Sequence, residues 1–482
     1  MIHNSTHKIK RQKLRELFNI PQQDGSILVF TVVIIFIFSL VMLGLLSYAT
    51  TELRLDRSTV TREQAFQIAE AGANYYEWHL ANFPNDFWDG NASTTPGPYV
   101  HNFVDAATGQ TIGKFSLTIT PPTAGSTIVN VQSSGYSLAD PSSIRTTKVR
   151  YGIPSLAQYA FLANGDVWIG PTESVSGQLF SNGGIRFDGT GNAPIMSAKS
   201  TYQCQWYHGC GPVNGPGLTK PGIWGAAPAS TQNFWQFPVP NTDFTSITAD
   251  LATMKGSAQS AGIYLAPSGA QGYSLVFKNN GTVDIYKVTS LVAGEPRGVD
   301  TSNVTHNNSL DYNARNFLSN QAIPANGIIY VEDKVWVEGT VKGRATVAAA
   351  VLPYNAATAP SIMIPNNIVY LAKDGTNSLG LISQQDILIT FNSPNNLEID
   401  AALIAQNGAD QRWFYGAGTT KNSITIYGAV ASYGTWTWSW DSPVDSGYIN
   451  TSTTYDSSLL YAPPPNFPLS ASGYQQISWG SN

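Results

Sequence analysis

The sequence is long, weakly charged and rich in turn-forming residues. Its 482 residues allow about three units of ordinary domain size, and only 12% are charged, against roughly 25% in typical soluble domains. With 43 Gly and 28 Pro, many short strands and turns are expected, which argues against a helical cytosolic enzyme. The 26 basic and 31 acidic side chains give a net charge of −5. Such a surface offers no basic field for phosphates, so no nucleic-acid partner is expected.

The two cysteines, Cys204 and Cys210, lie close together in the chain. Near-absence of free thiols is typical of an oxidising compartment, and the spacing predicts a local disulfide. The alternatives are two unrelated thiols, or a zinc site with His208. The zinc site would lack a fourth ligand and the usual ligand spacing.

Residues 26–51 contain no charged side chain, and Ile, Val, Leu and Phe dominate Ile27–Leu46. About 20 such residues in a helix cross a hydrocarbon core of about 30 Å. Five basic residues against two acidic ones precede the segment, so the N-terminus is predicted in the cytoplasm, with the body exported across the inner membrane. A cleaved secretory signal would have a shorter apolar core.

The helical pattern continues beyond the membrane segment. Residues 50–82 contain no proline and carry an apolar stripe at spacings of three and four: Val60, Ala65, Ala69, Gly72, Ala73, Tyr76 and Leu80. One helix over residues 26–82 is therefore predicted, about 57 residues or about 85 Å long. Pro84 marks its expected end.

Two motifs in this region resemble a known family. A basic leader (residues 1–25) ending in Gly25 and followed by Ser26-Ile27-Leu28-Val29-Phe30 resembles a type IV prepilin processing site. The stretch that contains Ala65, Phe66, Ala69 and Glu70 is similar to the Ala-Phe-x-x-Ala-Glu-Ala signature of PilX-type minor pilins. The resemblance covers about residues 15–85.

The resemblance implies cleavage between Gly25 and Ser26 by a prepilin peptidase, methylation of the new terminus, and packing of the helix among membrane lipid and other pilin subunits. It also implies that Ala65, Phe66, Ala69 and Glu70 belong to the membrane and assembly helix. Major pilins carry glutamate at the fifth mature position, where this chain has Phe30. An unpaired ammonium buried among helices is costly, so Phe30 argues against a repeating shaft subunit and is compatible with a tip position. It leaves open whether the leader is cleaved and whether the protein enters a fibre.

Residues 83–155 are predicted to form a pilin-like antiparallel β region. Three alternating runs, Gly113–Thr120, Thr127–Ser134 and Arg145–Gly152, are separated by turn residues. Their apolar face needs a cover, which the outer half of the long helix can provide.

Residues 156–482 are predicted to form a β-solenoid-like ectodomain. The run Leu381-Ile382-Ser383 is echoed 22 residues later by Leu403-Ile404-Ala405, and more loosely by Val430-Ala431-Ser432. Such steps suit coils that stack on one another and favour a right-handed parallel β-helix; an antiparallel sandwich or barrel is the alternative. Residues 195–325 break the rhythm and are predicted to be an insertion. The overall fold class is α+β followed by all-β.

No catalytic or cofactor-binding motif is present, and no cofactor or metal is predicted. Carboxylates such as Asp386, Glu398 and Asp400 would serve a carbohydrate-active lyase or glycosidase only if paired in one cleft. Trp436, Trp438 and Trp440 alternate along the chain, which suggests either an adhesive patch for a glycan or cell surface, or a cap on the last coil.

The sequence therefore favours a non-enzymatic minor pilin or pilus-associated surface protein that acts in type IV pilus assembly or adhesion. The alternatives are a membrane-anchored carbohydrate-active enzyme and an assembly scaffold that stays in the membrane.

Overall fold

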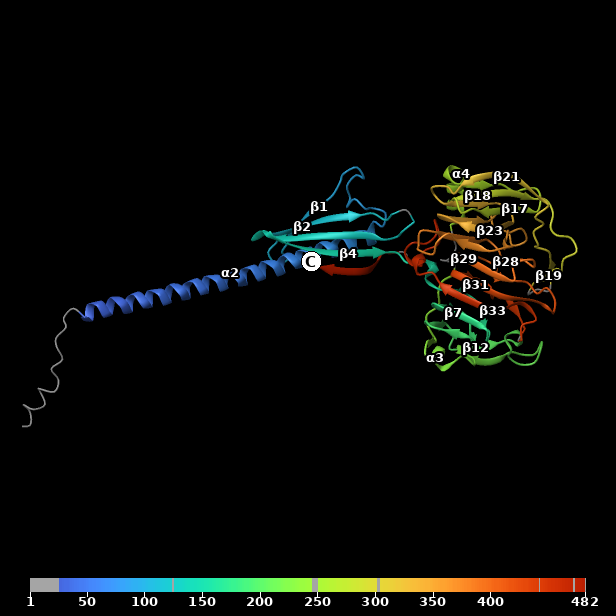
Figure 1. The fold of residues 1–482 in the computed structure, drawn as a ribbon, viewed down its shortest axis with the longest axis horizontal. Helices are drawn as coiled ribbons and strands as arrows, with labels where there is room; N and C mark the ends of the chain where they lie inside the picture. Colours follow the sequence, from blue (N-terminus) through green and yellow to red (C-terminus); the bar gives the residue numbers. More distant parts are fainter. Residues whose placement is uncertain are drawn as a thin grey trace, which may run out of the picture.

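The computed structural model describes residues 26–123, 125–244, 250–300, 304–441, 443–470 and 473–481. Figure 1 shows a long helix, a small sheet beside its far end, and a larger β body beyond that sheet. The predicted leader, with Gly25, lies outside the described residues.

Helix α2 (Ser26–Asn82) has the predicted bounds and is unbroken over 57 residues. Large apolar side chains from Ile27 to Leu46 are 47% to 76% exposed on every side of the helix. The hydroxyls of Thr31 and Ser39 donate to carbonyls of the preceding turn, so these polar groups are satisfied inside the helix. Among the described residues, α2 is the one helix long and apolar enough to span a membrane.

The second half of α2 covers one face of a five-stranded antiparallel sheet, as predicted. The three predicted runs form its central strands, and the order is β1 (Tyr99–Val104), β2 (Thr111–Thr120), β3 (Val129–Ser137), β4 (Asp140–Gly152) and β34 (Gln475–Ser481). Phe115 and Leu117 of β2 pack with Tyr76 and Leu80 of α2 in one buried cluster. We call this helix half and sheet the head.

The helix approaches β3 closely because both surfaces carry small residues. A Cβ on Gly135 would meet the backbone of Ala65 and Ala69. Both alanines are fully buried. The spacing of Ala65 and Ala69, one helical turn apart, therefore has a structural purpose in the head.

Strand β34 returns from the C-terminus to the head, where it pairs with β4. The prediction that residues 156–482 form one ectodomain is therefore wrong at its C-terminal end. The β body, residues 156–470, is inserted between two neighbouring strands of the head sheet. Arg344 of the body also joins the units, since its Nη2 donates to the carbonyls of Gly125 (3.0 Å), Ala462 (2.7 Å) and Pro463 (2.6 Å).

The body consists mainly of short strands that stack in parallel in three ladders. The first ladder contains, in spatial order, β16 (Ile263–Leu265), β22 (Ile328–Val331), β24 (Arg344–Ala349), β27 (Ser378–Ser383), β29 (Asn396–Ala405), β31 (Thr419–Ser432), β5 (Phe161–Ala163), β8 (Leu179–Ser181), β11 (Ile195–Ser197) and β15 (Trp235–Gln236). The second contains β17 (Gly272–Phe277), β23 (Val335–Val341), β25 (Ile362–Ile364), β28 (Ile387–Ile389) and β30 (Asp410–Gln411). The third contains the far end of β23, then β26 (Ile368–Tyr370), β29, β31, β33 (Ser446–Tyr455), β7 (Glu173–Ser176) and β10 (Thr190–Gly191).

The remaining elements are smaller sheets, strands that pair with a single ladder strand, and a short helix. Strands β6 (Val167–Ile169), β9 (Ile185–Phe187) and β14 (Ile223–Trp224) form a parallel sheet. The antiparallel pairs are β12 (Thr201–Cys204) with β13 (Leu218–Pro221), β19 (Gly298–Val299) with β20 (Thr305–His306), and β18 (Thr282–Val288) with β21 (Arg315–Ala322). Strand β32 (Ser439–Trp440) pairs with β33, and α3 (Ala229–Gln232) is a short helix. The turn at residues 279–281 joins the antiparallel strands β17 and β18.

The sequence repeat corresponds to parallel neighbours in the first ladder. Leu381 lies opposite Leu403, and Leu403 lies opposite Val430. All three side chains are buried in one continuous core. Strands that are covered on both faces read as near-continuous apolar runs, which explains why this repeat is visible in the sequence.

The order of the strands in space differs from their order in the chain. A first run, residues 156–236, leads from β5 to one end of the body, and a second run, residues 263–455, starts at the opposite end and returns. The runs meet where β5 lies beside β31 and β7 lies beside β33, which we call the seam. In Figure 1 the orange-red strands β31 and β33 accordingly lie next to the green β7, between α4 and α3.

Residues 195–325 thus do not form a separate insertion. Strands β11, β15, β16 and β17 from this interval pair in the ladders and contain both ends of the stack. The link between the ends includes α4 (Leu251–Ala261), whose Leu251, Met254 and Ala258 are buried. Asp250 caps α4 by accepting from the Thr253 N–H (2.9 Å).

Candidate functional site: an aromatic groove on the body

A groove of about 2220 Å³ lies along the second ladder and crosses the seam. Its floor follows matched positions on successive strands: Trp336, Met363, Leu388, Gln411 and Thr437. Neighbouring strands lie about 4.8 Å apart, so these five positions span about 19 Å. Six tryptophans contribute to the lining, together with Tyr207: Trp168, Trp206, Trp336, Trp413, Trp436 and Trp440.

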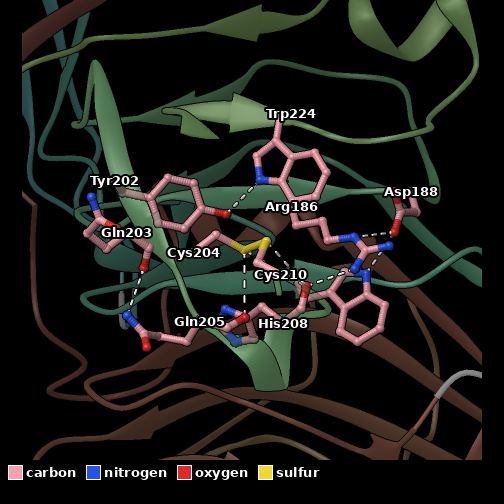
Figure 2. The surroundings of a disulfide bond; sticks show 10 residues. Arg186, Asp188, Tyr202, Gln203, Cys204, Gln205, His208, Cys210 and Trp224 are labelled. Carbon is pink, nitrogen blue, oxygen red and sulfur yellow. Dashed lines mark hydrogen bonds and ion pairs between the residues drawn. A yellow bond between two sulfur atoms is a disulfide. The ribbon is translucent and has the colours of Figure 1, made fainter. Parts of the chain in front are cut away.

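A disulfide-closed loop forms one wall of the groove. Cys204 and Cys210 are joined, and the short 3-10 helix Trp206–His208 lies between them (Figure 2). Trp206 and Tyr207 are 36% and 56% exposed, and their rings meet edge to face with centroids 5.7 Å apart. The loop therefore presents two aromatic faces at a large angle to each other.

Buried groups hold this loop to the body. His208 is buried, and burial together with the nearby Arg186 guanidinium lowers its pKa to about 4, so the imidazole is neutral at pH 7. The His208 carbonyl accepts a hydrogen bond from Arg186 Nη1 (2.8 Å), which Figure 2 shows beside the disulfide. A buried carbonyl that accepts from a charged donor is a strong link, because such bonds are about twice as strong as neutral ones.

Arg186 also orients the neighbouring tryptophans. Its guanidinium lies over the rings of Trp168 (4.3 Å) and Trp224 (5.2 Å) and forms an ion pair with Asp188 (2.8 Å). Trp168 Nε1–H donates to Asp188 Oδ2 (2.9 Å). The half-buried Trp168 ring is thus fixed at the groove.

Thr305 and His306 of β20 also line the groove, together with Asp300. The His306 ring stacks on Trp413, with centroids 4.5 Å apart, and His306 Nε2 lies 2.8 Å from Asp300 Oδ2. Asp386 on the floor accepts from the Ala409 N–H (2.8 Å). Burial raises the pKa of Asp386 above its usual range, and the nearby Asp300 carboxylate adds to the rise.

The groove is acidic. Among its described lining residues are four carboxyl groups, from Glu173, Asp300, Asp386 and Asp441, and one ammonium, from Lys334. Burial raises the pKa of Glu173 to about 7. The field in the groove favours neutral or cationic ligands over polyanions.

The predicted tryptophan patch is not exposed. Trp436 and Trp438 are 5% and 1% exposed, and the Trp436 ring stacks on Phe161 of β5 at 4.7 Å. Their side chains fill the core at the seam, so they neither form an adhesive face nor cap an end of the stack. Only Trp440 is half-buried at the groove, where its Nε1–H donates to the Arg412 carbonyl (2.8 Å).

The residues singled out on α2 lie far from the groove. Ser26 is the first residue of α2, Phe30 is 69% exposed, and the half-buried Phe66 makes an edge contact with Trp479 of β34 at 6.0 Å. Ala65 and Ala69 are buried against β3, and Glu70 is half-buried.

Of the three candidate acids, only Asp386 lines the groove. Glu398 and Asp400 both pair with Lys373 at 2.8 Å, so they form a structural ion pair on the third ladder. Within the described ranges, no group of three or more His, Cys, Asp or Glu side chains could hold a metal ion.

Most of the groove could not be predicted from the sequence. The position of Trp206 and Tyr207 between two cysteines was the one usable signal. Trp168, Trp413 and His306 come from distant parts of the chain, and no local pattern links them.

The helix, the head and the body define a protein whose described residues include one N-terminal apolar helix of the membrane-anchoring kind and a body made mainly of β-strands. No protein-family model matches the sequence, and no curated protein sequence matches it. Among solved structures, the chain is similar to the competence-associated pilin ComZ from Thermus thermophilus, with 12% identity over 88% of this chain and 98% of that chain and a TM-score of 0.31. It is also similar to an ice-binding protein from the Antarctic ascomycete Antarctomyces psychrotrophicus, with 11% identity over 63% of this chain and 98% of that chain and a TM-score of 0.24. Neither TM-score is high enough to establish a shared fold.

Proposed function

We propose that the protein is a PilX-type minor pilin or pilus-associated surface protein that acts in type IV pilus assembly or adhesion. In this proposal α2 anchors the chain in the inner membrane with its N-terminus in the cytoplasm, and the head and body are exported. The observation that carries the proposal is the division of α2 into two halves. The first is apolar and exposed on all sides, and the second packs on an antiparallel sheet.

The first half of α2 needs a partner that the described residues do not supply. Exposed apolar side chains over about 20 residues are stable in lipid or among other apolar helices. Phe30 adds an apolar ring where a carboxylate would neutralise the terminal ammonium of a neighbouring subunit. A tip position, with no subunit above it, suits this substitution.

For the body, we infer a right-handed parallel β-helix whose three faces are the three ladders. The parallel register and the single continuous core support this inference. Each coil covers the next, so the stack can hold a binding surface far from the membrane.

The test is expression of the full chain, with its leader, in cells that assemble type IV pili. Mass spectrometry of the membrane and of sheared filaments is expected to find a mature chain that begins at a methylated Ser26, while Gly25→Leu keeps the leader. Phe30→Glu is expected to raise the amount in filaments, with Phe30→Leu as the matched control. A mature terminus elsewhere would contradict the proposal, and a processed chain confined to the membrane would favour the assembly scaffold.

A carbohydrate-active enzyme is the second candidate, because Asp300 and Asp386 line the same groove and interact electrostatically. Glycosidases use two carboxyl groups with different protonation states, and raised pKa values are typical of the acid. Release of reducing ends from neutral polysaccharides by the wild-type protein, abolished in Asp386→Asn, would establish this function. We propose a non-enzymatic role and expect no release.

A further inference from the structure

We propose that the groove binds a neutral oligosaccharide, with Trp206 and Tyr207 as the platform on which a sugar ring stacks. This inference deepens the proposed function, since it rests on the body facing the cell exterior and gives the adhesive role a ligand class. The site differs from the predicted tryptophan patch, whose members Trp436 and Trp438 are buried.

The two exposed aromatic rings of the loop are the proposed platform for a sugar ring. Large aromatic side chains usually bury their faces, and exposed ones in a concave site are typical of ligand binding. Trp206 and Tyr207 lie in the loop closed by the Cys204–Cys210 disulfide, whose two cysteines are 6 positions apart in the sequence. A closed loop loses little conformational freedom on binding, so its rings are already arranged for a ligand. Sugar rings have apolar C–H faces that match an aromatic face.

The polar side chains of the groove match the hydroxyl groups of a sugar. A neutral sugar has hydroxyl groups that both donate and accept. Gln385 and Asp386 are half-buried on the floor, and Thr435 and His306 are half-buried at the walls. Amide, carboxylate, hydroxyl and imidazole groups together accept from and donate to hydroxyls, whereas a purely apolar groove would favour a lipid.

The charge of the groove disfavours anionic ligands. Its lining has four carboxyl groups and one lysine, and even with the raised pKa of Glu173 and of Asp386 it has no excess of positive charge to bind phosphates, sulfates or uronic acids. Single-stranded nucleic acid also stacks on aromatic rings, but its binding grooves are positively charged. Charge therefore favours a neutral glycan over DNA.

A groove of about 2220 Å³ can hold more than one sugar ring. Trp336, Met363 and Leu388 are buried in one cluster with Leu310 and Trp413, so we expect the sugar to contact the less buried lining residues Trp206, Tyr207 and Thr435. We expect affinity to rise with oligosaccharide length over the first few sugar rings.

The experiment uses the full chain in lipid nanodiscs. A glycan array of neutral and acidic glycans is followed by titration with the best neutral oligosaccharide, with hyaluronate and with single-stranded DNA. Wild-type protein is expected to bind neutral glycans, and Trp206→Ala/Tyr207→Ala to bind them about tenfold more weakly or worse. Trp78→Ala, which removes an exposed tryptophan on α2, is the matched control and is expected to bind like wild type.

A second variant tests the role of the loop. Cys204→Ser/Cys210→Ser keeps both rings but opens the loop, so several-fold weaker binding is expected while hydrogen exchange of the ladders stays unchanged. Binding of DNA or hyaluronate in preference to neutral glycans would overturn the proposal. So would neutral-glycan binding that survives loss of both rings, or no glycan binding at all. A chain that is processed at Ser26 and recovered in filaments but binds no neutral glycan would overturn this inference alone.

Discussion

The head and the body are both β structures with buried cores, but their strands find partners in different ways. In the head, β1, β2 and β3 each pair with the next strand along the chain, so Val131 lies opposite Val149. In the body, the seam brings Phe161 opposite Val430. The head therefore depends mainly on one helix covering one face, whereas the body depends on the continuity of ladders across the seam. Damage to one unit is expected to leave the other folded.

The largest effect is expected from Trp438→Ala, which empties the core at the seam. Loss of a buried tryptophan costs about 3 to 5 kcal/mol, and Trp438 is in contact with Trp436 and Phe161. Chemical denaturation is expected to show an earlier transition of the body, and hydrogen exchange to show faster opening of β5 and β7, with α2 and β3 unchanged.

Trp78→Ala is the control for this substitution, because Trp78 is an exposed tryptophan outside the body. Equal destabilisation by both variants, or faster exchange in the head, would contradict a separate role for the seam.

The second prediction uses pH to weaken the seam. Glu173 of β7 pairs in register with Thr451 of β33, and burial raises its pKa to about 7 from 4.5. Between these values the folded protein keeps a proton that the unfolded chain has lost. The free energy of unfolding is therefore expected to fall as pH rises from about 4.5 to 7, by up to about 3 kcal/mol, and then to level off.

Glu173→Gln is expected to remove this part of the pH dependence, because the amide does not titrate. The measurement is the difference between wild-type and Glu173→Gln unfolding free energies from pH 4 to 8. A difference that does not change with pH would show that folding does not raise the pKa of Glu173.

The smallest effect is expected from Gly135→Val in the head. Its side chain would meet the backbone at Ala65 and Ala69, so α2 must move away from β3. Overpacking of this kind costs about 1 to 3 kcal/mol. Hydrogen exchange should accelerate in the second half of α2 and in β3, with the body unaffected. Gly480→Val on β34, where a Cβ meets open space, is the matched control and is expected to leave exchange unchanged.

The parts that sequence analysis predicted well share one property, which is that their signal is local. The stripe through Ala65 and Ala69 arises from the helical period, and the alternation through Phe115 and Leu117 from the strand period. The repeat of Leu381 and Leu403 is visible because stacked strands place like residues at like positions. In each case the pattern lies within a few tens of residues.

The errors arose where distant segments meet. Trp436 and Trp438 alternate like a strand face, and nothing near them in the chain reveals that Phe161 stacks on them. Residues 195–325 lack the repeat because they contain both ends of the stack and the segment that links those ends. Strand β34 contains Trp479 and could belong to either unit by composition, and its partner lies more than 300 residues away.

By itself, the sequence determined the apolar anchor, the bounds of the long helix, the three central strands of the head and the closeness of the two cysteines. Each follows from charge, periodicity or spacing within one short segment. Tertiary structure alone decided the seam, the return of β34 and the groove. These depend on which distant surfaces bury the most apolar area together, and that choice is made by the whole chain at once.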